Sequence, residues 1–355
     1  MDQSVSKGAS RKSYLDILRV IAILAVVLMH STGFFDNTVQ IHSVQWNCSI
    51  IFGSITRFAV PVFIMISGAL MLNKESIDIK RLYSKNILRF VTAYLFWSIF
   101  YTIVYSFIPH YGSISIISIK NLISGTLKGG YFHLWYMPLI IGLYVALPLL
   151  HACLRSMRRE LIGYWVLMSF LICFVLPQMR EIEIVNYIFG EAIDHFNVGL
   201  WGEYLLYFIL GYALDKYELP DRAYKAICVG GMICALFTIA AVWIPSAQAG
   251  NLVGILRMNN TPNVLWMSVA LFLFVKKHSS RLKVNGYNRI LSFLSELSFG
   301  VYFVHEFVLV ELHDLFFRSS NAASAILVLF VTGTIVSYAL IWMIRKVTRL
   351  SRYIT

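Results

Sequence analysis

A positively charged side chain and an imidazole share the first apolar stretch of this chain. Arg19 and His30 are eleven residues apart in a run from Tyr14 to Phe34. On an α-helix this spacing puts both on one face, about 16 Å apart along the axis. A central arginine costs about 2.5–3.5 kcal/mol in a membrane helix. The pair predicts a site for a charged molecule near one surface, with proton or group transfer deeper in. Contact of Arg19 with lipid phosphate and a structural hydrogen bond of His30 are the alternative. Asp16 lies close enough to pair with Arg19.

A second arginine lies inside the next apolar stretch. Arg57 is followed by Pro61, and then by Ser67 and Gly68. Proline has no backbone N–H, so Pro61 would leave the carbonyl of Arg57 without its helical partner. We therefore expect a kinked helix. A free carbonyl beside a buried cation would suit an anion or another ligand, and a kink with an internal salt bridge is the alternative.

Two further groups combine aromatic and hydrogen-bonding residues. His133 and Trp135 open an apolar segment, where they predict either an interfacial aromatic belt or a platform for a sugar or acyl group. Ser298, Tyr302 and His305 follow one another at helical spacing, which places them on one face. Such a face would either line a cavity or form hydrogen bonds between helices.

Composition restricts the class of protein. Of the 355 residues, 58% are hydrophobic and only 14% are charged, and the mean hydropathy is +0.70. These values are typical of a protein that crosses the membrane several times. The net charge of +12 does not indicate nucleic acid, because Lys and Arg cluster in short loops between apolar runs. The five cysteines form no Cys-x-x-Cys pair and no metal-ligand spacing is present, so we expect free thiols and no metal.

The predicted fold is all-α, a polytopic membrane bundle of about ten transmembrane helices in a single domain, 1–355. With a cytoplasmic N-terminus, twenty-three of the 30 Lys and Arg side chains fall in inner segments and five in outer loops. This asymmetry predicts that both tails, 1–13 and 345–355, are cytoplasmic. An interfacial helix is expected at 115–128 in a long outer loop. The predicted apolar segments are 14–34, 46–72, 87–108, 134–152, 161–176, 204–214, 226–244, 264–275, 291–312 and 323–344.

These motifs together resemble the acyltransferase-3 family of integral membrane O-acyltransferases. We expect a compact bacterial type, without the C-terminal esterase-like domain of some relatives. Val20 is a small departure, since glycine is common after the motif arginine. The resemblance depends on Arg19-(ten residues)-His30, the helix with Arg57, Pro61 and Ser67-Gly68, His133-Leu-Trp135-Tyr136, and the Ser298, Tyr302 and His305 stretch.

The resemblance implies a multi-pass enzyme of a bacterial inner membrane that takes acetyl from cytoplasmic acetyl-CoA. The acceptor would be a hydroxyl of a surface polysaccharide or lipid-linked sugar. A hydroxyl is a poor nucleophile near pH 7, so His30 is expected to act as general base or as acyl carrier. Arg19 and Arg57 are assigned to the catalytic site and to the donor. The predicted acceptor contacts are His133, Trp135, Ser298, Tyr302 and His305.

A transporter or flippase of a polysaccharide or its precursor is the alternative from a different class. Ten helices with buried charges suit both functions. The two differ in whether acyl groups are transferred or substrate moves unmodified.

Overall fold

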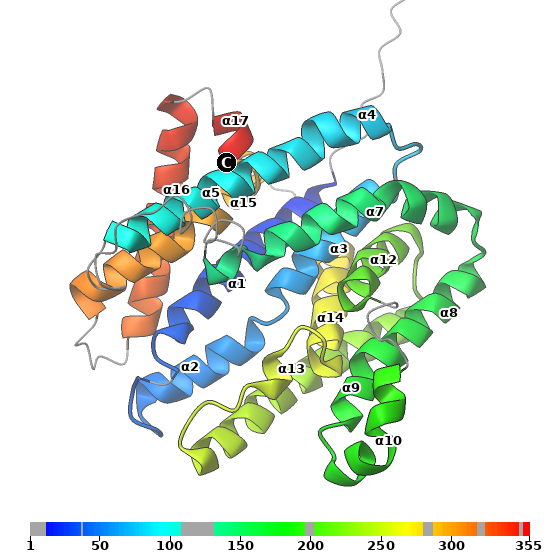
Figure 1. Ribbon diagram of the computed structural model, residues 1–355, viewed down its shortest axis with the longest axis horizontal. Helices are drawn as coiled ribbons and strands as arrows, with labels where there is room; N and C mark the ends of the chain where they lie inside the picture. The colour runs from blue at the N-terminus through cyan, green and yellow to red at the C-terminus, as the bar shows by residue number, and fades with distance from the viewer. Residues whose placement is uncertain are drawn as a thin grey trace, which may run out of the picture.

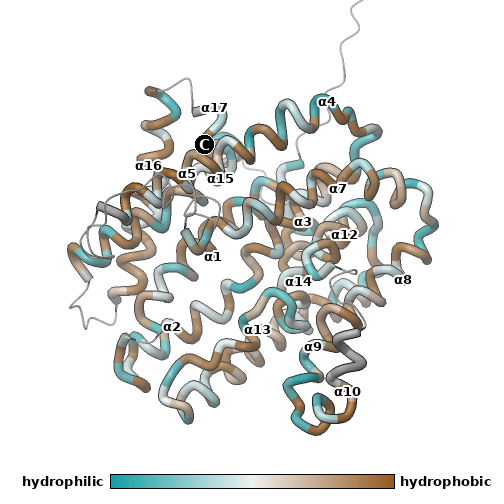
Figure 2. Tube along the Cα trace, in the orientation of Figure 1, coloured by the Kyte–Doolittle hydropathy of each residue, from teal (hydrophilic) through white to brown (hydrophobic). Residues whose placement is uncertain are grey.

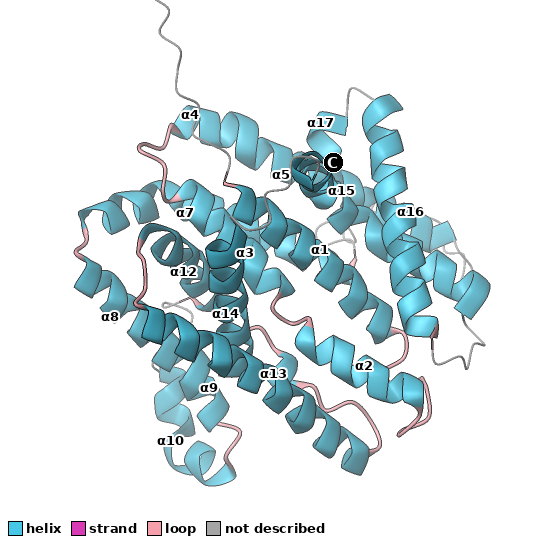
Figure 3. Cartoon of the chain, turned by 180° about the vertical axis from the view of Figure 1, so that it is seen from behind, coloured by secondary structure: helices cyan, strands magenta, loops and turns pink. Residues whose placement is uncertain are grey.

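Every regular element that the structure describes is a helix. In this computed structural model, the described residues are 12–36, 38–107, 131–195, 202–279, 287–317, 324–347 and 351–355. Helices joined by loops make up this part of the chain, without any strand (Figure 1 and Figure 3). Hydrophobic residues cover much of the helical trace (Figure 2). The prediction of an all-α bundle is confirmed.

The long helices follow one another with few interruptions. The principal ones are α1 (Ser13–Gly33), α2 (Val44–Ile55), α3 (Ala59–Met71), α5 (Leu88–Phe107), α7 (Tyr136–Ser156), α8 (Arg159–Phe170), α10 (Glu183–His195), α12 (Glu203–Lys216), α13 (Asp221–Ala249), α14 (Pro262–His278), α15 (Tyr287–Leu312) and α16 (Ala325–Val347). Shorter helices are α4 (Ile79–Arg81), α9 (Leu176–Met179) and α17 (Ser351–Ile354). Single turns of other helix types occur at Leu82–Ile87, Phe132–Trp135, Leu171–Val175, Ile255–Arg257 and His313–Phe317.

Eight helical stretches of the described chain are long and apolar enough to cross a membrane. The chain is therefore a multi-pass membrane protein. Two further helices, α12 and α14, have 14 and 17 residues and correspond to the two shortest predicted segments, 204–214 and 264–275. The expected interfacial helix at 115–128 lies outside the described residues.

The second predicted segment, 46–72, is divided in the structure. α2 ends at Ile55, a turn follows at Thr56–Phe58, and α3 begins at Ala59. The expected kink at Pro61 was wrong in its position, because Pro61 falls in the first turn of α3, where a missing N–H leaves no bond unmade. The break comes earlier in the chain, and Arg57 Nε donates to the carbonyl of Gly53 at 2.9 Å. The arginine side chain thus satisfies a carbonyl at the end of α2.

Two helices occupy the centre of the bundle. α1 packs against α2, α3, α14, α15 and α16. In α15 the share of buried residues reaches 72%, whereas in α13 it is 17%. The polar residues of α1 and α15 are therefore enclosed by protein, which is where intramembrane polar groups are tolerated.

A close contact between α3 and α12 depends on two glycines. A Cβ at Gly68 would lie 1.9 Å from the carbonyl oxygen of Phe208, and a Cβ at Gly211 would lie 1.9 Å from that of Met65. The two backbones approach closely because neither glycine has a side chain. Small residues serve this purpose at many membrane helix interfaces.

Polar contacts tie together one end of the bundle. Lys12 Nζ lies 2.6 Å from Asp215 Oδ2, and Asn73 Nδ2 donates to the same oxygen at 2.6 Å. Lys12 precedes α1, Asn73 follows α3 and Asp215 lies in the last turn of α12. The start of α1 thus lies beside the ends of α3 and α12, in agreement with the predicted topology, which places all three at the cytoplasmic side.

Candidate functional site

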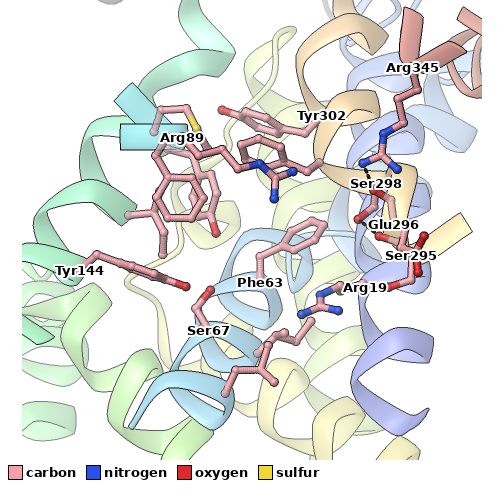
Figure 4. Close-up of a pocket in the computed structure, with 17 residues that line it drawn as sticks. Arg19, Phe63, Ser67, Arg89, Tyr144, Ser295, Glu296, Ser298, Tyr302 and Arg345 are labelled. Carbon is pink, nitrogen blue, oxygen red and sulfur yellow. Dashed lines mark hydrogen bonds between the residues drawn. The ribbon is translucent and has the colours of Figure 1, made fainter. Parts of the chain in front are cut away.

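A cavity lined by three arginines lies between helices from both halves of the chain. Its volume is about 360 Å³. Arg19 comes from α1, Arg89 from α5 and Arg345 from α16, and Figure 4 shows the guanidinium groups of Arg19 and Arg89 directed into the space between the helices. The remaining wall is largely apolar and aromatic. It is formed by Phe63, Ile66, Ser67, Leu70, Phe90, Tyr136, Met137, Ile140, Tyr144, Ser295, Glu296, Ser298, Phe299 and Tyr302.

The arginines of this cavity are held by short contacts. Arg19 Nη1 donates to Asp16 Oδ1 at 3.0 Å, as its spacing in the sequence predicted, and Ser295 Oγ donates to the same oxygen at 2.8 Å. Arg89 Nη2 donates to the carbonyl of Thr355 at 2.8 Å, and Arg345 Nη2 donates to that of Glu296 at 2.7 Å. A guanidinium has five N–H donors, and these bonds engage only some of them in each arginine. The others can donate to a bound molecule, so the cavity is suited to an anion such as phosphate.

A second group, which we call the histidine cluster, consists of His30, His133, His305 and Glu306. The ring centroids of His30 and His305 are 4.9 Å apart, and those of His133 and His305 are 5.3 Å apart. His30 Nδ1 lies 3.0 Å from Glu306 Oε2. Three elements that are far apart in the sequence contribute to the cluster: α1, the turn Phe132–Trp135 and α15.

Glu306 is the member that sequence analysis missed. Its side chain is 4% exposed, and its contact with His30 has the length of an ion pair, although Oε2 makes no hydrogen bond of ordinary geometry. A carboxylate inside an apolar run is expensive in a membrane, and this cost was a signal that could have identified Glu306. Beside His30, the carboxylate can orient the imidazole.

The face of α15 that carries Ser298, Tyr302 and His305 connects the cavity to the histidine cluster. Ser298 and Tyr302 line the cavity, and His305 lies one turn further along. Tyr302 also donates its hydroxyl to the carbonyl of His133 at 2.6 Å. The two regions are therefore consecutive along α15, and Arg19 and His30 join them in the same order along α1.

His133 and Trp135 have different surroundings although they are two residues apart. His133 is buried, and neither of its ring nitrogens makes a hydrogen bond of good geometry, although the Phe303 carbonyl is near the ring. Trp135 is 42% exposed and its ring lies 5.6 Å from that of Tyr204. Only His133 thus belongs to the histidine cluster. The ring of Trp135 lies at the protein surface, where another molecule can contact it.

Arg57 is not among the residues that line the cavity, so its predicted role in binding the donor stays a prediction. It lies near Asp36 and Arg257, and Arg257 is only 3% exposed. Arg257 Nη1 donates to Asp36 Oδ2 at 3.3 Å and Arg257 Nη2 to the carbonyl of Ile50 at 3.0 Å. Burial lowers the pKa of Arg257 and raises that of Asp36, while the opposite charge of each partner counteracts these changes. These residues form a buried network that links loops to α2.

The structure is that of a multi-pass helical membrane protein with an arginine-lined cavity and a buried histidine cluster between its helices. A family model described as an acyltransferase domain matches residues 12–342, nearly the whole chain. The chain therefore belongs to the acyltransferase-3 family and is a membrane acyltransferase. No curated protein and no solved structure matches it.

Proposed function

We propose that this protein is an O-acetyltransferase of a bacterial inner membrane. It transfers acetyl from cytoplasmic acetyl-CoA to a hydroxyl of a surface polysaccharide or a lipid-linked sugar. The observation that carries the proposal is the order of the two sites along α1 and α15. An arginine-lined cavity lies toward the predicted cytoplasmic side, and a buried His30–Glu306 pair lies further in.

Coenzyme A carries phosphates at one end and the thioester at the other. Phosphates suit the guanidinium groups of Arg19, Arg89 and Arg345, since arginine binds phosphate with several charge-assisted hydrogen bonds. The apolar and aromatic remainder of the wall suits the uncharged arm of the donor. The arm would extend past Tyr302 toward His30.

His30 is the group proposed to act on the acceptor. In one route, His30 removes the proton of the acceptor hydroxyl while the hydroxyl oxygen attacks the thioester carbonyl. The C–S bond then breaks, and His30 passes the proton to the CoA thiolate. In the other route, His30 attacks the thioester carbonyl first; the C–S bond breaks, CoA leaves as the thiolate, and His30 carries the acetyl group as an acyl-imidazole. The acceptor hydroxyl then attacks this acetyl group, the bond to His30 breaks, and the hydroxyl proton passes to the CoA thiolate. In both routes Glu306 orients His30 and stabilises its positive charge.

The remaining polar groups have roles that follow from their positions. His133 lies beside His305 and has a ring N–H available for the oxyanion of the tetrahedral intermediate. Tyr302 positions the His133 segment through its bond to the backbone. The exposed ring of Trp135 would contact the sugar acceptor.

The first test is transfer of labelled acetyl from acetyl-CoA by the purified protein, with and without host glycan, followed by mass spectrometry of both products. The wild type should acetylate the glycan. His30→Ala should lower the rate by about 10²–10⁴-fold, the usual cost of losing a general base.

The acyl-carrier route predicts labelled protein in the absence of glycan, and the direct route does not. Near wild-type transfer by His30→Ala at normal expression would contradict the assignment. Movement of glycan across the membrane without acetylation would instead support the transporter alternative.

A further inference from the structure

We propose that His30, His305 and Glu306 form a binding site for a divalent transition metal, with Zn²⁺ as the expected ion. The ligand atoms are His30 Nδ1, His305 Nε2 and Glu306 Oε2. One ligand atom of each residue lies within 4.8 Å of the other two, and His30 Nδ1 lies 3.0 Å from Glu306 Oε2. Two imidazoles and one carboxylate are a common zinc ligand set, with a fourth position left for water or substrate.

The geometry needs only small movements to bind an ion. Because no two ligand atoms are more than 4.8 Å apart, some point lies within about 2.8 Å of all three. Zinc–nitrogen and zinc–oxygen bonds are about 2.0–2.2 Å long. Side-chain movements of less than about 1 Å therefore complete the site. Adjacent positions on α15 provide two of the ligands, which restricts the site to one location.

The hydrogen bonds of His305 leave the required nitrogen free to bind a metal. Nδ1 lies 2.7 Å from the carbonyl of Tyr302 and 3.2 Å from that of Val301. A carbonyl only accepts, so Nδ1 must carry the proton and Nε2 has the lone pair. Metal-binding histidines commonly donate their second nitrogen to a backbone carbonyl in this way.

Two of the ligand atoms make no hydrogen bond of ordinary geometry. His305 Nε2 is buried without a hydrogen-bond partner, and Glu306 Oε2 has its 3.0 Å contact with His30 Nδ1 but no hydrogen bond of ordinary geometry. The two residues are 0% and 4% exposed. A buried lone pair and a buried carboxylate oxygen are costly when left alone. A cation between them would satisfy both, and it would bridge Glu306 and His30 in place of their direct contact.

The consequence for the enzyme is inhibition, and this part of the inference depends on the proposed function. A neutral imidazole has one lone pair, so a metal on His30 Nδ1 leaves the proton on Nε2. His30 can then neither accept a proton from the acceptor nor attack the thioester. Metal binding and acyl transfer would therefore exclude each other.

Binding is tested with Co²⁺ as a spectroscopic probe for the full-length protein in detergent. The wild type should bind one equivalent with the intense visible absorption of a four-coordinate ion, and Zn²⁺ should displace it. His305→Gln and Glu306→Gln should each weaken Co²⁺ binding by at least about 100-fold, since losing even an outer partner costs 10–100-fold. His313→Gln is the matched control. His313 also lies 3.2 Å from a carboxylate, Asp314, but belongs to no three-ligand group among the described residues.

X-ray absorption of the wild-type Co²⁺ form should show two imidazole ligands, a readout that does not depend on any variant folding. Absence of Co²⁺ binding by the wild type, or equal loss in His313→Gln, would overturn the site.

Acyl transfer without metal binding would reject this inference and leave the proposed function intact. Metal binding by a protein that transfers no acyl group would support the site and reject the proposed function. Zn²⁺ should stop transfer and a chelator should restore it; transfer by the metal-bound form would overturn the inhibitory role.

Discussion

The contact between His30 and Glu306 puts a carboxylate where a membrane protein can least easily accommodate one. Removing one partner of a buried charged pair typically costs more than the pair itself contributes, because the other charge is left unpaired. Replacing both partners by apolar side chains of similar volume is often neutral or stabilising, so stability does not account for Glu306. Its position 3.0 Å from His30 is better explained by chemistry at that histidine.

Arg19 should bind the donor. Arg19→Ala should weaken the binding of acetyl-CoA by roughly 10- to 100-fold, the value of one or two charge-assisted hydrogen bonds. Isothermal titration or a thermal-shift titration with CoA measures this. Arg222→Ala is the control, because Arg222 is exposed at the start of α13 and does not line the cavity. An unchanged affinity for CoA together with lost acceptor binding would reverse the assignment.

Sequence alone predicted the residues that share one helix. The pairing of Asp16 with Arg19 and the common face of Ser298, Tyr302 and His305 follow from helical periodicity. Arg89 and Arg345 were not predicted as site residues because each comes from a different helix, at a place where basic residues normally mark a cytoplasmic loop. The charged neighbours of Arg57, which are Asp36 and Arg257, were missed for the same reason, since both belong to other segments of the chain.

At the scale of elements, apolar run length predicted most helices but not the interruption between α2 and α3. Gly53, Ser54, Thr56 and Arg57 lie close to this turn, but over the length of a membrane helix the apolar residues of the run 46–72 outweigh them, so mean hydropathy does not mark the turn at Thr56–Phe58. The proline was visible in the sequence, but its effect depends on whether it falls inside a helix or in its first turn. That position is set by the tertiary contacts of α3.

The contact between α3 and α12 should be sensitive to a single methyl group. Gly68→Ala places a Cβ where the Phe208 carbonyl lies, so the helices must separate. Overpacking of this kind typically costs about 1–3 kcal/mol. A lower melting temperature of the detergent-solubilised protein is expected.

Gly142→Ala on α7 is the matched control for this measurement. A Cβ there would meet nothing within 4 Å, and alanine favours the helix more than glycine does. Equal melting temperatures for Gly68→Ala and the wild type would show that the two helices adjust without loss.

At the scale of the whole molecule, the asymmetry of basic residues predicts which face receives each substrate. In sealed inside-out vesicles, acetyl-CoA added to the exposed cytoplasmic face should label glycan trapped in the lumen. Right-side-out vesicles given external acetyl-CoA should remain unlabelled, because the arginine-lined cavity would then be inaccessible to the donor. Equal labelling of both kinds of intact vesicle would contradict this orientation.

One helix, α1, carries both Arg19 and His30 and therefore fixes the distance between them. Their separation along α1, about 16 Å, is set by the rise of the helix and cannot adapt to the substrate. The proposed donor therefore needs an arm between its anionic group and its thioester that is long enough to span this distance. If the donor binds as proposed, thioesters with a short arm should not reach His30 while their charge remains at Arg19. We therefore expect the enzyme to distinguish donors by the length of this arm as well as by the acyl group they carry.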